Sequence, residues 1–299
     1  MNSQRHMSKT EQRQMRHLNL LRKGGLFQPQ PEELVSARAN NTADLKKAYH
    51  LVYETFLEQK FILPNTAEIR IRPWELTPET ATFVSRTATD VVGVFSSIID
   101  TDDLGLPSDK SFRLELDKLR AEDSVLCEMS NQAVAPKYRH TSVSTELMQC
   151  VFAEAWHNDV TDLLCAISPK QINFFTLMGF EQVGDIKSYS DVVFDPVALM
   201  RLCDIQNRWT YEDLNSGGFN TFWKRFFITE NPYMAVTPLW NDMARAYFAN
   251  PENISSLIAG CEDQIEAFAP HVHSALTERT GVDFEHMFTR ESRESFFSI

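Results

Sequence analysis

Cysteine is scarce in this sequence, with five residues in 299 and no C-x-x-C pair. An odd and scattered set indicates neither a disulfide framework nor a cysteine-based zinc site. The thiols are instead interpreted as small core side chains in a reducing compartment, which predicts a cytoplasmic protein.

Long apolar runs and an excess of basic residues are also missing. No run approaches the ~18 residues of a membrane span, and the N-terminus lacks the apolar region of a secretion signal. The 29 Lys and Arg face 41 Asp and Glu, a formal net charge of −12, so nucleic acid is not expected as a partner. The histidines lack metal-ligand spacing, and no nucleophile elbow or Walker loop occurs, so neither a metal nor a tightly bound cofactor is expected.

The composition nevertheless supports a packed core, because 43% of the residues are hydrophobic and 11% are aromatic. Residues 1–40 form a polar arm with several basic side chains before Gly24-Gly25. The arm is expected to be partly flexible or loosely docked. The alternative is a basic helix that binds a partner or makes peripheral contact with a membrane.

Hydrophobic periodicity predicts an α/β domain over residues 41–195 and a helical extension over residues 196–299. Thr42 is expected to cap a helix that runs to about Lys60. Strands are predicted at 67–72, 79–87, 91–99, 125–134 and 163–167, and further helices at 107–119, 143–158, 197–203, 240–248 and 254–268.

The stretch from Ser124 to Asp185 is the most informative, because it has the order strand, loop, long helix, strand, short helix, strand. A basic turn with Lys137, Arg139 and His140 leads into a Thr/Ser-rich helix start. Backbone N–H groups at such a helix start can hold an anionic phosphate chain beside the carboxyl ends of two strands. We therefore expect the functional site here.

Several motifs in this stretch carry a family resemblance. Arg139-His-Thr-Ser142-Val-Ser144 resembles the R-x-x-G-x-G/A pyrophosphate loop of GNAT acyltransferases, and Phe174 to Phe180 resembles their F-Y-x-x-x-G-F segment. AYHLVYETFLEQKFI, the GLP of residues 105–107, FRLELDKLR and Glu128 together resemble the long-chain N-acyl amino acid synthases, relatives of the acyl-homoserine-lactone synthases. The resemblance covers residues 43–195.

The resemblance implies a GNAT-like mixed, mostly antiparallel central sheet flanked by helices. It also implies an N-acyltransferase that moves a long-chain acyl group from acyl carrier protein or acyl-CoA to the amine of an amino acid or similar small molecule. Two alternatives stay open: a non-catalytic GNAT-fold protein that binds acyl thioesters, and a signal synthase of the acyl-homoserine-lactone type.

The resemblance assigns the donor phosphate to one turn, comprising Lys137, Arg139, His140, Thr141, Ser142, Val143 and Ser144. Ser142 and Ser144 replace the glycines of the family pattern, which keeps the N–H donors but adds side chains. The alternative is an ordinary helix cap by Thr141 or Ser142. An acidic carrier protein would also need a basic landing patch, for which Lys170 is a further candidate.

Glu128 is the expected catalytic base, because it is a carboxylate on an otherwise apolar strand and burial would raise its pKa. The alternatives are a solvent-facing residue or an ion pair with Arg113 or Arg120. Phe175 stands where many GNAT enzymes carry a tyrosine that protonates the leaving thiolate, so that acid is missing or replaced by Tyr189.

Two further groups are assigned to substrates. Tyr53, Phe56 and Phe61 are expected to wall the acyl chain, although core packing explains a helical aromatic stripe equally well. Arg70 and Arg72 alternate on a predicted strand, where they either receive an amino-acid carboxylate or form a solvated face.

Overall fold

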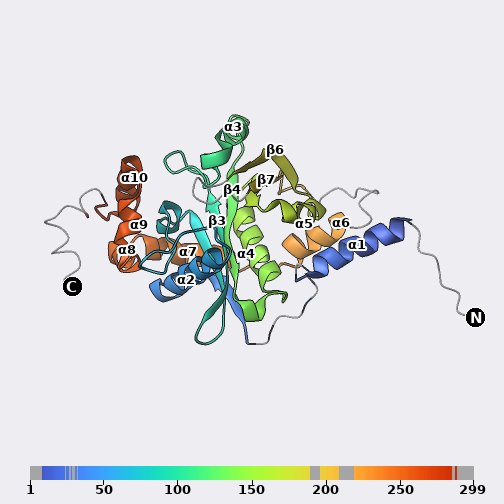
Figure 1. Ribbon diagram of the computed structural model, residues 1–299, viewed down its shortest axis with the longest axis horizontal. Coiled ribbons are helices and arrows are strands. Elements are labelled where there is room, and N and C mark those ends of the chain that lie inside the picture. Colours follow the sequence, from blue (N-terminus) through green and yellow to red (C-terminus); the bar gives the residue numbers. More distant parts are fainter. Residues whose placement is uncertain are drawn as a thin grey trace, which may run out of the picture.

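The described part of the chain is organised around one mixed sheet (Figure 1). The computed structural model describes residues 9–23, 25, 26, 28, 31, 33–188, 196–208, 219–284 and 287. The strands are β1 (Val35–Arg38), β2 (Thr80–Arg86), β3 (Val91–Ile99), β4 (Leu126–Val134), β5 (Asp162–Ile167), β6 (Glu181–Ser188) and β7 (Pro196–Leu202). Their order is β1-β2-β3-β4-β5-β7-β6, and only β4 and β5 pair in parallel. The predicted mixed, mostly antiparallel sheet is therefore confirmed.

The parallel ladder between β4 and β5 is short, running from the pair Leu126–Asp162 to the pair Met129–Cys165. Beyond it β4 continues against β3, whereas β5 continues against β7. In the β3–β4 register two residues, Asn131 and Gln132, lie opposite one, Phe95, and Asn131 has φ +55°. This is a bulge, and it bends β4 just past its last parallel pair.

Helices cover both faces of the sheet. On one side, at the right of Figure 1, lie α1 (Lys9–Lys23), α4 (Val143–His157), α5 (Ile172–Leu177) and α6 (Phe219–Lys224). On the other lie α2 (Thr42–Glu58), α8 (Pro251–Ile258), α9 (Glu262–Glu266) and α10 (Pro270–Thr280). The remaining α-helices are α3 (Asp109–Arg120), at the top of the view, and α7 (Thr237–Phe248), which packs on α4 and β1.

Short helical turns complete the fold: η1 (Pro73–Leu76), η2 (Pro136–Tyr138), η3 (Pro169–Gln171) and the π-helical η4 (Arg225–Thr229). Helix α2 shows how local sequence sets these elements. Its cap is Asn41, one residue before the expected Thr42, and the Asn41 side chain accepts a hydrogen bond from the Asp44 N–H at 2.9 Å. Its apolar stripe is buried against the sheet as predicted.

Three predictions of secondary structure were wrong. The helix expected over 254–268 is divided into α8 and α9, because the chain turns at Gly260, which has φ +89°. Residues 197–203 were expected to be helical, but residues 196–202 form β7, which lies between β5 and β6. A strand that has neighbours on both edges and helices over both faces consists mostly of consecutive apolar residues. Periodicity cannot distinguish such a run from a short buried helix. Residues 67–72, predicted as a strand, pair with no strand in the described structure and lead into η1.

The segment expected to be a polar arm contributes two elements, α1 and β1. Strand β1 pairs with β2, and the buried Arg38 side chain on it donates to Glu154 of α4 at 3.1 Å and to Asn241 of α7 at 2.7 Å. Leu21 at the end of α1 is fully buried in the core beneath α4. The domain limits at residues 40 and 195 stay predictions, although β1 and β7 lie outside them and belong to the sheet.

Candidate active site

Glu128 lies in the middle of the sheet, on β4, with cross-strand neighbours Ile98 and Leu164. The residue is 1% exposed, and its Oε2 accepts a hydrogen bond from the backbone N–H of Ser108 at 2.9 Å. Burial raises the pKa of this carboxyl to about 7, while the hydrogen bonds from Ser108 and the charge of Arg72 act in the opposite direction. A carboxyl with this pKa can both take up and release a proton near neutral pH.

The expected alternative partners of Glu128 are engaged elsewhere. Arg120 binds Asp100 and Asp109, and Arg113 binds Asp117 at 3.1 Å on the surface of α3. Neither arginine forms an ion pair with Glu128 in the described structure. The structural ion-pair interpretation is therefore wrong, as is that of a solvent-facing side chain.

A strip of hydroxyl and amide groups continues from Glu128 along the same face of the sheet. Thr82 and Ser96 lie on this face, 3.3 Å apart at their hydroxyl oxygens, and Ser130 lies two residues beyond Glu128. Glu75 of η1, fully buried, accepts from Asn131 at 2.8 Å. These polar groups lie between the apolar clusters beneath α2 and α3.

Arg70 and Arg72 border this strip, but each already binds groups of the chain itself. Arg70 donates to Asn131 Oδ1 at 2.7 Å and its guanidinium lies 5.0 Å from the centre of the Phe56 ring. Arg72 pairs with Glu75 and donates to Ser130 Oγ at 3.3 Å. The charge of Arg72 is thus balanced within the protein, and a carboxylate-binding role for either arginine stays a prediction.

The predicted phosphate turn lies where the sequence placed it, between β4 and the start of α4. Arg139 donates to Glu58 of α2 at 2.7 Å and to the Val134 carbonyl at 3.1 Å. Ser142 is the cap residue of α4, but its hydroxyl donates to the Glu146 carboxylate at 2.7 Å and caps no backbone N–H. The turn residues therefore come together, with several of their side chains already bonded to the chain.

The aromatic residues assigned to substrates lie on opposite faces of the sheet. Phe175 of α5 is 3% exposed and packs edge-on against Phe180 in the core beneath α4. Phe56 and Phe61 meet edge-on, with ring centres 5.8 Å apart, on the α2 side, and Tyr53 is buried nearby on α2. Tyr189, the substitute acid, lies outside the described residues.

Sequence reasoning missed three contributors to the site: the Ser108 N–H, Glu75 and Asn131. Ser108 follows the G-L-P segment that carried part of the resemblance. That segment indicated that the region matters, but it did not indicate that the Ser108 N–H donates to Glu128. Glu75 and Asn131 gave no signal, because a lone acid after a tryptophan and a lone amide in a strand are common.

In the described ranges, no group of three or more His, Cys, Asp or Glu side chains is placed to hold a metal ion. Likewise, none of the described helices combines the length and the apolar character needed to cross a bilayer.

Comparison with known proteins places this site in context. Residues 47–203 match the family model described as N-acyl amino acid synthase FeeM. The solved structure of FeeM from uncultured soil microbes is 23% identical, with a TM-score of 0.53 over 62% of this chain and 97% of that one. A putative N-acetyltransferase from Lactobacillus plantarum is 13% identical, with a TM-score of 0.43 over 58% of this chain and 99% of that one.

The CoA-dependent acyl-homoserine lactone synthase BjaI is also similar, with 13% identity and a TM-score of 0.43 over 64% of this chain and 89% of that one. No curated protein sequence matches the chain. The family match spans more than half of the residues, including β4, the turn and α4, and the shared fold is that of FeeM. The chain therefore belongs to the family of the N-acyl amino acid synthase FeeM and is a GNAT-fold acyltransferase.

Proposed function

We propose that this protein transfers an acyl group, of long chain, from an acyl-CoA or acyl carrier protein thioester to the amine of an amino acid or a similar small molecule. The observation that carries the proposal is Glu128, a buried carboxyl with a pKa of about 7 beside the point where β4 and β5 separate. The five unpaired cysteines support a reducing, cytoplasmic setting.

The donor arm enters where the parallel ladder ends. Past Met129, β4 turns away from β5 at the Asn131 bulge, so the β4 edge that faces β5 has backbone groups available for the amides of a pantetheine arm. This brings the thioester carbon to the level of Glu128 and Ser130. The phosphate end of the arm then lies toward the turn of residues 137–144, at the start of α4.

The acceptor amine approaches from the other face, along the polar strip at Ser130 and Arg72. Glu128 in its ionised form takes a proton from the ammonium, and the neutral amine attacks the thioester carbon. A C–N bond forms and the C–S bond breaks. The attacking nitrogen gives its second proton to solvent, the thiolate leaves and takes a proton from solvent, and protonated Glu128 then returns its proton to solvent. Because a thiolate leaves readily compared with an alkoxide, Phe175 does not need to supply an acid for this step.

Thiol release from acyl-CoA and acyl carrier protein donors, measured with a panel of amino acids, tests the proposal. Wild-type protein should release thiol only with an amine present, and Glu128→Gln should turn over ~10²-fold more slowly while still binding donor. Glu181→Gln is the matched control, because it removes an exposed carboxylate of β6 and should leave turnover unchanged.

A non-catalytic thioester-binding protein is the second candidate, since Phe175, Ser142 and Ser144 depart from the family pattern at functional positions. Donor binding by the wild type without thiol release for any amine would support that candidate and contradict the enzyme.

A further inference from the structure

Residues 67–72 carry the two arginines that border the polar strip, but they pair with no strand in the described structure. Backbone N–H groups away from water need partners, which a strand would otherwise supply. Three consecutive N–H groups here donate to three separate elements: that of Arg70 to the Tyr49 carbonyl of α2 at 3.2 Å, that of Ile71 to the Gln264 side chain of α9 at 3.2 Å, and that of Arg72 to Glu75 of η1 at 2.7 Å. The place of both arginines therefore depends on helices rather than on the sheet.

Gln264 is the contribution of the C-terminal helices to this segment. Its Oε1 accepts the hydrogen bond from the Ile71 N–H, and the Ile71 side chain is buried in the apolar cluster beneath α2. Ile265, the next residue of α9, is fully buried in the same cluster. Packing thus fixes α9 at the place from which the Gln264 side chain reaches the backbone between the two arginines.

The two arginines connect this anchor to the strand that bears the catalytic base. Arg70 donates to Asn131 Oδ1 at 2.7 Å, and Arg72 donates to Ser130 Oγ at 3.3 Å. Ser130 lies two residues beyond Glu128 on the same face of β4. The anchor from α9 therefore lies between the two residues whose guanidinium groups border the strip along which the acceptor approaches.

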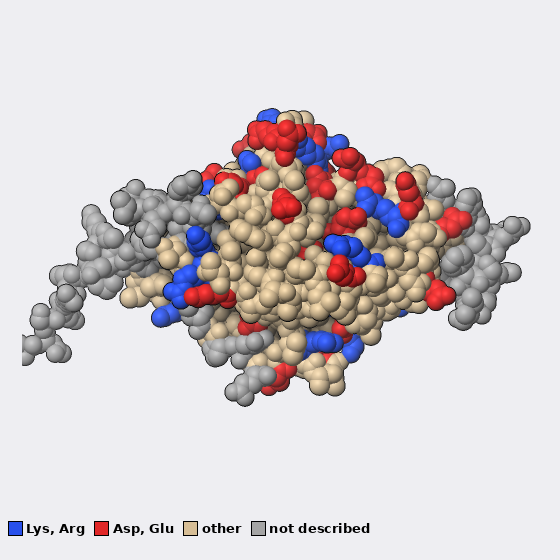
Figure 2. Space-filling model, turned by 180° about the vertical axis from the view of Figure 1, so that it is seen from behind, with Lys and Arg blue, Asp and Glu red and all other residues tan. Residues whose placement is uncertain are grey.

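A second anchor holds the loop of residues 100–108, which ends at the residue whose N–H donates to Glu128. The loop is acidic, with three Asp among residues 100–103, and it leads into α3, over which acidic side chains gather at the top of Figure 2. Because like charges this close repel one another, a fixed loop conformation needs bound cations. Arg120 of α3 is one, 2.6 Å from Asp100, and Arg279 of α10 is another.

Arg279 joins this loop to the segment that follows η1. Its Nε and Nη2 donate to the two carboxylate oxygens of Asp103 at 2.7 Å each, and its Nη1 lies 2.8 Å from Glu79 Oε1. A guanidinium that binds both oxygens of a carboxylate fixes direction as well as distance. Because Glu79 lies three residues past the end of η1, Arg279 fixes η1 and the loop relative to each other.

Helix α10 is itself held firmly by packing. Leu276 on α10 and Phe284 just after it are fully buried in the cluster beneath α2, and the helix also contacts η1. Trp74 of η1 donates its indole N–H to the Gly105 carbonyl of the loop at 2.8 Å. Helix α10, η1 and the loop thus contact one another in pairs, and together they support the acceptor side of the site.

We infer that α9 and α10 complete the acceptor side of the active site, with Gln264 and Arg279 as positioning residues for the groups that the amine contacts. The inference rests on the proposed function, which brings the amine along the polar strip. Both helices lie outside residues 47–203, which the family model matches. The donor turn of residues 137–144 is instead bonded to α2, through Arg139 and Glu58, so changes in α9 or α10 should affect the amine and not the donor.

Steady-state thiol release tests the inference, because it gives separate KM values for amine and donor. The donor is palmitoyl-CoA or palmitoyl carrier protein, whichever the wild type turns over, and the amine is the amino acid with the fastest release. Gln264→Leu removes the acceptor of the Ile71 N–H, and Arg279→Ala removes both ion pairs. Each variant should raise the KM for the amine at least about fivefold and change the KM for the donor less than about twofold.

Three further variants separate positioning from a general loss of structure. Gln264→Glu keeps an oxygen acceptor for the Ile71 N–H and should stay within about twofold of wild type in both KM values. Asp263→Asn changes an exposed residue of α9, and Arg245→Ala removes an exposed cation of α7 that pairs with Asp242, so both should leave the two KM values unchanged. Urea unfolding at the assay temperature establishes that each variant is folded.

Each other outcome overturns the inference. An amine KM that stays near the wild-type value in Gln264→Leu and Arg279→Ala, or one that rises together with the donor KM, leaves α9 and α10 with a packing role only. The same holds if Gln264→Glu loses as much as Gln264→Leu, or if a control variant loses as much as either. Wild-type protein that releases no thiol with any amine contradicts the proposed function itself, and the inference with it.

Discussion

Glu128→Gln offers a sharp physical test, because it replaces a carboxyl that must lose a proton inside the sheet with a neutral group of the same shape. The folded-state pKa of Glu128 is about 7, against an ordinary value of 4.5, and burial is the main cause. That difference corresponds to about 3 kcal/mol, since each pH unit is worth about 1.36 kcal/mol.

The direction in which folding stability changes with pH follows from the number of protons that Glu128 binds in the folded and in the unfolded chain. Below about pH 4.5 the carboxyl is protonated in both the folded and the unfolded chain, so burial costs no ionisation energy. Between pH 4.5 and 7 the unfolded chain releases the proton while the folded chain keeps it, and folding stability falls as the pH rises. Above pH 7 both states are ionised and the loss levels off at about 3 kcal/mol.

Urea unfolding of wild type and Glu128→Gln at pH 5, 6, 7 and 8 measures this loss as the difference between their free energies of unfolding. The contributions of the other carboxyls are the same in both proteins and cancel in that difference. The glutamine variant should gain stability relative to wild type by about 2–3 kcal/mol across that range. Asp103→Asn is the control: Arg279 lowers the pKa of Asp103 to about 2, so its stability difference should not vary above pH 5. A Glu128→Gln difference that is constant with pH would refute a protonatable carboxyl in the sheet.

Three other outcomes follow from the structure. Wild-type kcat/KM should rise with pH and level off above about 7, as the Glu128 base ionises; a profile without this step would exclude Glu128 as the base. Phe56→Ala should extend the longest acyl chain accepted in a donor series, at a cost of about 3 kcal/mol or less, because its ring is only partly buried; an unchanged limit would assign the ring to packing. Arg38→Ala leaves Glu154 buried without its partner and should cost about 3–5 kcal/mol in urea unfolding, whereas a loss below about 1 kcal/mol would contradict a structural role for β1.

Local pattern predicted much of the central unit. The period of 3.6 in α2 and α4, the Pro136 stop after β4 and the apolar run 163–167 within β5 are properties of neighbouring residues, and the structure has each of them. The apolar neighbours of Glu128 favoured its burial but left a solvent-facing side chain open, and the structure shows it buried.

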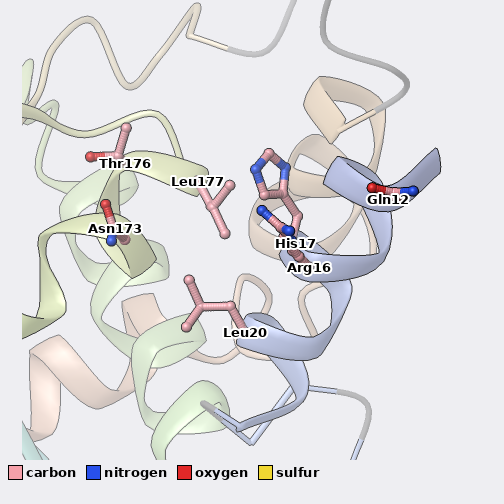
Figure 3. A pocket seen from close by; sticks show the side chains of 7 residues that line it. All are labelled: Gln12, Arg16, His17, Leu20, Asn173, Thr176 and Leu177. Atoms are coloured by element: carbon pink, nitrogen blue, oxygen red, sulfur yellow. The ribbon is translucent and has the colours of Figure 1, made fainter. Parts of the chain in front are cut away.

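What the sequence could not predict depends on contacts between distant segments. Residues 196–202 are a strand because β5 and β6 accept them as a neighbour, and no local signal separates that run from a helix. The approach of the Ser108 N–H to Glu128 and the pairing of Arg139 with Glu58 join residues 20 and 81 positions apart. A cavity between α1 and α5 (Figure 3) is lined by residues 12–20 and 173–177, which lie far apart in the sequence, so neither segment indicated it alone.

The central claim is acyl transfer to an amine with Glu128 as the base. Mass spectrometry of lipid extracts tests it most directly, with cells that produce equal amounts of folded wild-type protein or Glu128→Gln. Wild-type cells should accumulate a species whose mass equals a long-chain acyl group joined to an amine through an amide, and cells with the glutamine variant should contain ~10²-fold less of it. Absence of any N-acyl species in the wild-type extract, or equal amounts in both, would contradict the account.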